Sequence, residues 1–297
     1  MAHDPNTTAI SHPLFWGALA VITASVLLAI MDGIGKWLMR DLPMPQVVWA
    51  RYFFHTLMVG AVFSLRGGFS FVHTRRPWLQ LVRASCLMGV TLCLYWAIQS
   101  VSLADATAIV FFAPVLVTLL AGVLLKEPVG VPEWLAVGLG FVGVLFIVRP
   151  GFREADPALL LACVAAICLA CYFVMTRALK GYDSEQTTLF HTTLTGAVVL
   201  TLLLPLWWQT PSGLQWVFLM IMGVLGATGH FLLVKAFHLA SASRLSPYLN
   251  AQLVAAAVIS MLVFDDTLEW PFYLGSFLIV GAGLLVWAHQ VLRPRVK

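Results

Sequence analysis

Charged side chains are scarce in this sequence, and no polar stretch is long enough to form a separate soluble domain. Asp, Glu, Lys and Arg make up 10% of the 297 residues, against about 25% in a typical soluble domain. Hydrophobic residues make up 61%. The net charge of +4 is modest and comes largely from loops, so it does not suggest nucleic-acid binding. The composition therefore predicts an integral membrane protein whose main surroundings are the lipid bilayer.

The sequence also lacks several motifs for nucleotide binding, metal binding and catalysis. The sequence contains no Gly-x-x-x-x-Gly-Lys-Ser/Thr loop, so ATP-driven transport by this chain alone is disfavoured. It contains no His-Glu-x-x-His, and its five cysteines lie inside apolar stretches without the spacing of metal ligands. An intramembrane enzyme would need a clustered nucleophile, base or metal at depth, and the sequence shows none. We therefore expect no enzymatic activity, no cofactor and no bound metal.

The apolar residues gather in ten long stretches. A bilayer core of about 30 Å needs roughly 20 apolar residues per helix, and the breaks between stretches carry Pro, Gly or charge. The pattern predicts an all-α polytopic membrane protein. Its ten predicted transmembrane helices are residues 15–39, 45–65, 79–100, 104–125, 131–148, 157–179, 186–207, 213–237, 244–264 and 270–291.

The ten stretches divide into two sets of five, residues 14–149 and 157–291. A shift of 139 residues places Ala97-Ile98-Gln99 on Ala236-Phe237-His238, a weak internal similarity. Because each set has an odd number of spans, the two halves must cross the membrane in opposite directions. Inverted repeats are typical of carriers that open to one side and then the other. They argue against a channel, which tends to use rings of subunits or charged pore liners.

Lysine and arginine near the span ends predict the orientation, since cytoplasmic loops carry an excess of both. With the N-terminus inside, twelve of these residues fall on the cytoplasmic side and five on the outer side. The outer set is Lys36, Arg40, Arg51, Arg149 and Arg153. The cytoplasmic set is Arg66, Arg75, Arg76, Arg83, Lys126, Arg177, Lys180, Lys235, Arg244, Arg293, Arg295 and Lys297. The asymmetry predicts a multi-pass protein of the inner membrane with both termini in the cytoplasm.

Two segments carry a resemblance to a known family. Residues Tyr95–Thr107 lead to Phe111-Phe112-Ala113-Pro114 and then to Leu125-Lys126-Glu127 before a Gly-rich span. The second half repeats this theme in Lys235–Ser243 and Pro247-Tyr248. The sequence resembles the EamA domain of the drug/metabolite transporter superfamily over nearly its whole length. The resemblance implies ten helices in two inverted five-helix EamA repeats, a central cavity between them, and secondary transport of small metabolites.

Within that superfamily the chain looks most similar to YddG-type exporters of aromatic and other apolar amino acids. The resemblance therefore implies export of an amino acid by alternating access around a midplane cavity. Uptake of S-adenosylmethionine or another metabolite is the alternative, because Pro247-Tyr248 also looks like that branch. The sequence is compatible with a monomer or a dimer.

Ten residues are candidates for substrate binding. Amide and hydroxyl groups within apolar helices could bind a zwitterion without leaving a charge unpaired, and aromatic rings suit an apolar side chain. A proline within a span frees a backbone carbonyl that hydrocarbon cannot satisfy, so it suits a helix break beside a cavity. Hydrogen bonding between helices and contact with lipid are the structural alternatives. The candidates are Tyr95, Trp96, Gln99, Phe111, Pro114, Tyr172, His230, Tyr248, Asn250 and Gln252.

Three further residues are candidates for proton coupling or gating. Asp32 and Lys36 are four residues apart, so they share a helix face and could form an ion pair. His191 could carry a proton, since histidine titrates near neutral pH. Arg51 and His55 have the same four-residue spacing in the second span, where we expect Arg51 to anchor the helix at the outer interface rather than to take part in transport.

Overall fold

The computed structural model describes residues 12–124, 130–149, 157–179, 181–239 and 245–292, and their regular structure is entirely helical. Eight helices are long and apolar enough to cross a membrane, and two shorter apolar segments stand at the fourth and ninth predicted spans. This confirms the predicted fold class. The α-helices are α1 (His12–Leu38), α2 (Met44–Gly67), α3 (Pro77–Ser100), α4 (Leu103–Val110), α5 (Ala113–Leu124), α6 (Val131–Val148), α7 (Pro157–Ala178), α8 (Glu185–Leu203), α9 (Gly213–Leu239), α11 (Ala251–Val263) and α12 (Trp270–Leu292). The 3₁₀ helices are η1 (Ser70–Val72), η2 (Leu204–Leu206) and η3 (Ser246–Asn250).

Local sequence signals explain where several helices begin. Proline stands in the first two positions of α2, α3 and α6, where its missing N–H group costs no helical hydrogen bond. Ser102 caps α4, because its hydroxyl accepts a hydrogen bond from the backbone N–H of Asp105 at 2.9 Å. Ser184 caps α8 in the same way through Thr187. The breaks in hydropathy therefore coincide with real helix starts.

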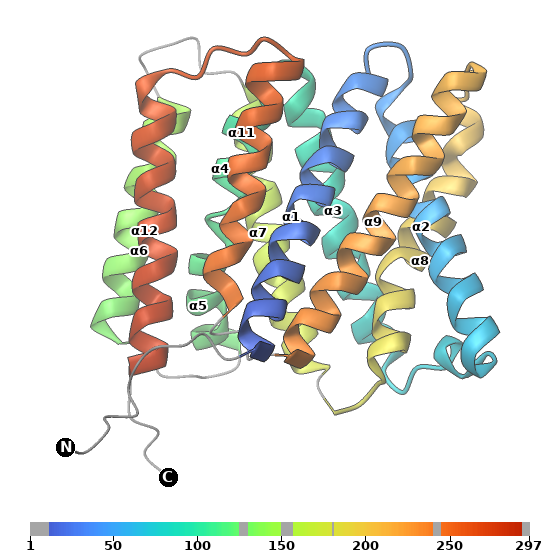
Figure 1. The fold of residues 1–297 in the computed structure, drawn as a ribbon, viewed down its shortest axis with the longest axis horizontal. Coiled ribbons are helices and arrows are strands. Elements are labelled where there is room, and N and C mark those ends of the chain that lie inside the picture. The colour runs from blue at the N-terminus through green and yellow to red at the C-terminus, as the bar shows by residue number, and fades with distance from the viewer. Residues whose placement is uncertain (1–11, 125–129, 150–156, 180, 240–244, 293–297) are drawn as a thin grey trace.

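The helices form two layers that are joined at both sides of the bundle (Figure 1). We call α1, α9, η3 and α11 the front layer, and α3, α4, α5 and α7 the rear layer. The most extensive contacts within the layers are α1 on α9 and α3 on α7, while α2 with α8 and α6 with α12 close the two sides. Exchanging the first five spans for the second five converts the α1–α9 contact into the α7–α3 contact and leaves the two closing pairs unchanged. The packing thus has the pattern of two inverted repeats, and each layer contains helices from both halves.

The fourth span, predicted at 104–125, is interrupted, and the described part of the ninth, predicted at 244–264, changes its helix type. Helix α4 ends at Val110 and α5 begins at Ala113, because Pro114 has no N–H group to donate to the carbonyl four residues earlier. In the ninth span, η3 passes into α11 at residue 251. A shift of 139 residues places the α4–α5 break on this transition, and a shift of 136 places it within η3. The fourth span is therefore interrupted at Pro114, whereas the ninth changes from a 3₁₀ helix to an α-helix without a gap.

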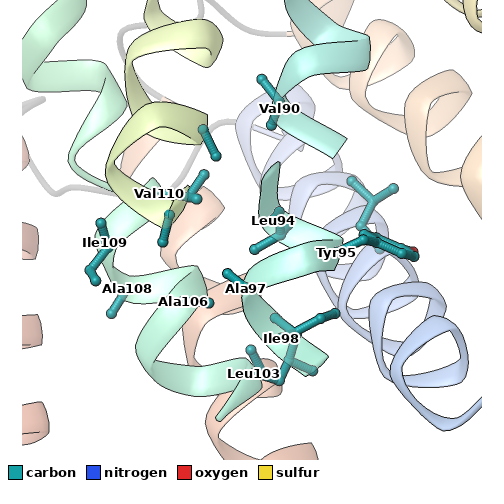
Figure 2. Close-up of a cluster of buried hydrophobic side chains, with 14 of the residues drawn as sticks. Val90, Leu94, Tyr95, Ala97, Ile98, Leu103, Ala106, Ala108, Ile109 and Val110 are labelled. Carbon is teal, nitrogen blue, oxygen red and sulfur yellow. The ribbon is translucent and has the colours of Figure 1, made fainter. Parts of the chain in front are cut away.

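Apolar side chains pack α4 against α3 (Figure 2). Leu94, Ala97 and Ile98 of α3 pack against Leu103 and Ala106 of α4, and most of these side chains are fully buried. In lipid this packing is stabilised by close van der Waals contact rather than by transfer out of water. Tyr95 leaves this apolar cluster and points toward α1 (Figure 2).

The two ends of the bundle carry different groups. The start of α1 and the end of α12 lie at the lower end in Figure 1, and the connection between α1 and α2 lies at the upper end. At the upper end Lys36 pairs with Asp266, and Arg149 pairs with Glu269. At the lower end the guanidinium of Arg76 lies over the ring of Tyr182.

This separation agrees with the predicted division of the loop charges, although Arg83 is buried and Arg51 is partly buried. The chain termini, residues 1–11 and 293–297, lie outside the described residues, so their cytoplasmic location stays a prediction.

Candidate functional site

A buried polar cluster joins α1, α2 and α3 in the upper half of the bundle. Nη1 of Arg51 donates a hydrogen bond to Oδ1 of Asp32 at 2.8 Å. The hydroxyl of Tyr95 donates to the same carboxylate oxygen at 3.2 Å and lies 3.3 Å from Nη1 of Arg51. Asp32 is only 4% exposed and Tyr95 is fully buried. The carboxylate and the guanidinium cancel one another's charge, which makes their burial tolerable.

A glycine on α1 makes room for the tyrosine of this cluster. A Cβ atom on Gly35 would lie 2.6 Å from the ring of Tyr95, a separation that side chains do not adopt. The ring therefore lies directly on the backbone of α1, where its hydroxyl reaches Asp32. The guanidinium of Arg51 lies over this ring, 5.5 Å from its centroid.

The predicted pairing of Asp32 with Lys36 is wrong. Nζ of Lys36 lies 3.5 Å from Oδ2 of Asp266 and donates to the carbonyl oxygen of Val101 at 2.9 Å. The long lysine side chain reaches the upper end, where its ammonium group lies over the ring of Phe264. Asp32 sits one turn deeper and takes the guanidinium of Arg51 instead. Arg51 is therefore a partner in the buried cluster and not an anchor at the membrane interface.

Two histidines lie next to this cluster. The rings of His55 on α2 and His230 on α9 have centroids 5.5 Å apart. His55 is 2% exposed and stands one helical turn from Arg51, whereas His230 is partly exposed. Gly226 allows the approach, because a Cβ there would lie 3.1 Å from Nδ1 of His55. The predicted candidate His230 thus contacts His55, which lies next to the cluster and which the sequence had not indicated as a binding residue.

A second buried arginine lies in the lower half, between α3, α7 and α8. Arg83 is fully buried, although the sequence placed it among the cytoplasmic loop charges. Its guanidinium donates to Oε1 of Gln80 at 3.1 Å and to the hydroxyl of Thr192 at 2.6 Å. It also lies over the ring of Tyr172, 5.1 Å from the centroid. Gln80 in turn donates to the carboxylate of Asp183 at 2.9 Å, so an amide connects the buried cation to a carboxylate at the lower end.

Three predicted binding residues face away from these clusters. Trp96 follows Tyr95 in the chain, but its side chain is 59% exposed on the outer surface of α3. Gln99 and Pro114 are also exposed. The reason is the helical period: α3 has one face against α7 and α1, and residues 96 and 99 lie on another. Pro114 sets the helix break, and its ring does not lie in the core.

The other predicted residues are dispersed. Phe111 and Gln252 are partly buried in the broken helices. Tyr248 packs beside a small apolar cluster of the front layer. Asn250 donates to the carbonyl of Pro247 at 3.0 Å, which closes η3. Nε2 of His191 lies 2.9 Å from the carbonyl oxygen of Val72 at the lower end, away from Asp32.

No group of three His, Cys, Asp or Glu side chains suitable for a metal ion occurs within the described ranges.

Three hydrogen bonds join the two layers in the upper half of the described structure. Tyr95 reaches Asp32, Lys36 reaches Val101, and the hydroxyl of Ser260 accepts from the backbone N–H of Ala104 at 3.0 Å. In the lower half, each layer has its own small apolar cluster. The front cluster is Ala18, Val21, Ala236 and Leu245, and the rear cluster is Ala113, Ala166 and Ala170. The layers are thus tied together at the upper end.

Comparison with known proteins agrees with this architecture. The model of the EamA-like transporter family matches twice, at residues 15–149 and 156–288. The chain belongs to the EamA-like transporter family. An S-adenosylmethionine uptake transporter of Rickettsia prowazekii (strain Madrid E) is 26% identical over 272 residues, covering 91% of this chain and 90% of the relative. A riboflavin transporter of Vibrio cholerae serotype O1 is 28% identical over 273 residues, covering 91% of each.

A solved crystal structure has the same fold. It superimposes with a TM-score of 0.63 at 19% sequence identity and covers 93% of this chain and 98% of that chain. Together with the two family matches, this identifies the protein as a multi-pass membrane transporter of small molecules.

Proposed function

We propose that this EamA-family transporter is an uptake carrier for a metabolite with a fused nitrogen heterocycle and a polar tail, with S-adenosylmethionine as the first candidate. The supporting observation is the similarity to the Rickettsia uptake transporter over nine-tenths of both chains. Riboflavin, transported by the Vibrio relative, also carries a fused heterocycle on a polar chain. Partly buried aromatic side chains of both layers, Tyr172 in the rear layer and Tyr248 in the front layer, suit such a ring system.

The mechanism we propose is alternating access between the two layers. The bonds around Asp32 and Lys36 close the upper end, and release of these bonds would let the layers separate there. The closing pairs α2–α8 and α6–α12 keep the sides of the bundle together during this motion. We propose that the lower end faces the cytoplasm, following the charge asymmetry of the loops.

Export of an aromatic or apolar amino acid is the second candidate function. It follows from the resemblance to YddG-type exporters, but the relatives compared above transport other metabolites. Fewer aromatic side chains are available to line a cavity than the sequence suggested, because Trp96 faces outward.

Counterflow in proteoliposomes tests the proposal. Vesicles loaded with unlabelled S-adenosylmethionine, riboflavin or phenylalanine are diluted into the corresponding labelled compound without a pH gradient. We expect transient accumulation with S-adenosylmethionine, and none in vesicles that lack the protein. Accumulation with phenylalanine alone would favour amino acid transport and overturn the proposal.

A further inference from the structure

The imidazole of His55 is buried with one nitrogen unsatisfied. Its Nε2 atom has no hydrogen-bond partner among the described residues, and the side chain is 2% exposed. Its Nδ1 side faces Gly226 of α9, next to the sulfur of Met31. A buried polar atom without a partner costs free energy, and its presence in a native structure calls for an explanation. The neighbouring ring of His230, which is partly exposed, gives this position a connection to the surface.

An ion pair lies beside the two imidazoles, while Lys36 of α1 pairs with Asp266 and the ammonium group of Lys235 on α9 lies over the ring of Phe231. Arg51 lies one turn from His55 on α2, and it is paired with Asp32 of α1. Tyr95 of α3 contributes a neutral hydroxyl to the same pair. On α8, the residues that can carry charge are Glu185 and His191, both in its first two turns at the lower end. A proton on either histidine therefore adds a net positive charge at membrane depth, which is costly unless an anion accompanies it.

We propose that His55 and His230 form a proton-binding site, and that the proton held there is carried together with a substrate carboxylate. This rests on the proposed function, since S-adenosylmethionine has a carboxylate and riboflavin does not. S-adenosylmethionine as a whole is a cation, so the compensation is local: its carboxylate lies beside the imidazoles and its ammonium and sulfonium groups lie away from them, and each ligand then favours binding of the other. The guanidinium of Arg51, whose side chain is 17% exposed, supplies a group that a carboxylate can approach. The carrier is thus a proton symporter for carboxylate-bearing substrates.

Uptake driven by a pH gradient tests the coupling. The membrane potential of the proteoliposomes is clamped at zero. Labelled S-adenosylmethionine is then added in an external solution that is more acidic than the lumen. One proton per substrate gives wild-type accumulation of up to about tenfold for each unit of pH gradient. In His55→Gln and His230→Gln we expect the ratio of gradient-driven uptake to counterflow to fall to the value measured without a pH gradient. His73→Gln, at an exposed position between η1 and α3, is the matched control and should accumulate substrate as the wild type does. Riboflavin, if transported, should show no accumulation driven by the pH gradient.

Nitrogen-15 NMR of the imidazoles in nanodiscs, recorded with a carboxylate present (S-adenosylmethionine or acetate), gives a readout that needs no transport. The signals lost in the His55→Gln and His230→Gln variants should shift together as the pH is changed, with one proton taken up by the pair. If neither signal moves between about pH 5 and pH 8, or if the double variant still accumulates substrate, the proposal is overturned. Failure of S-adenosylmethionine counterflow overturns the proposed function instead, and the NMR titration then still decides whether the pair binds a proton.

Discussion

Asp32 on α1 is paired with Arg51 on α2 at 2.8 Å, although Lys36 stands one helical turn away on the same helix. The difference lies in what each cation can reach. Lys36 is drawn to the carbonyl of Val101 and the carboxylate of Asp266 at the upper end. The planar guanidinium of Arg51 stays at depth, where it also contacts the hydroxyl of Tyr95. This arrangement leaves both buried charges compensated.

Removing one member of this pair should destabilise the protein more than removing both. Arg51→Leu leaves the carboxylate of Asp32 buried without its cation, a loss of about 3–5 kcal/mol. The double variant Asp32→Asn and Arg51→Leu should recover most of that loss. Thermal unfolding in detergent, followed by tryptophan fluorescence, measures both. Equal destabilisation by the single and the double variant would show that the pair is not the reason for the loss.

Tyr95 and Trp96 test which face of α3 serves transport. Tyr95→Phe removes the hydroxyl that joins α3 to Asp32, so we expect slower counterflow with normal membrane insertion. Trp96→Leu changes a side chain that is 59% exposed and should leave counterflow within about twofold of the wild type, as is usual for surface substitutions. The opposite ranking of the two variants would support the sequence-based assignment of Trp96 to the binding site.

Hydropathy predicted the helical architecture well, because a bilayer requires helices of a set length. The broken fourth span was also foreseeable from Pro114. The site was not foreseeable to the same degree. Arg83 looked like a loop charge beside the start of α3, yet it is buried by Tyr172, Thr188 and Thr192. These partners come from helices about 100 residues away in the chain, and nothing near Arg83 other than Gln80 signals them.

Two glycines should set the distance between α6 and α12. A Cβ on Gly143 would lie 2.7 Å from the carbonyl oxygen of Gly275, and a Cβ on Gly275 would lie 2.6 Å from that of Gly143. Gly143→Ala therefore forces the helices apart, and we expect a lower unfolding temperature and a loss of about 1–3 kcal/mol. Gly138→Ala on the same helix is the control, since nothing lies within 4 Å of its added methyl group. A destabilised Gly138→Ala variant and an unaffected Gly143→Ala variant would contradict this assignment.

The lower end should weaken in acid through Asp183. Burial alone would raise the pKa of this carboxyl, but hydrogen bonds from Thr74, the backbone of Arg75 and Gln80 outweigh it and lower the pKa. The pKa of Asp183 is lower in the folded state than in the unfolded state. The ionised carboxylate therefore stabilises the fold fully at a pH above its ordinary pKa of about 4, and this stabilisation is lost as the pH falls through the pKa of the folded state.

Unfolding temperatures measured from neutral pH down to about pH 3 should therefore fall less steeply for Asp183→Asn than for the wild type. Asp41→Asn at the upper end serves as the control, since Asp41 is exposed. Parallel curves for Asp183→Asn and the wild type would show that these hydrogen bonds do not stabilise the lower end.

Spin-label distances across the two ends test the alternating layers most directly. In a cysteine-free background, labels at Arg40 and Ser100 report on the upper end, and labels at Leu239 and Leu81 report on the lower end; all four side chains are exposed. When a transported substrate is added, we expect a longer population to appear for the upper pair and a shorter one for the lower pair. Unchanged distributions, or lengthening of both pairs together, would contradict a carrier that opens its two ends in turn.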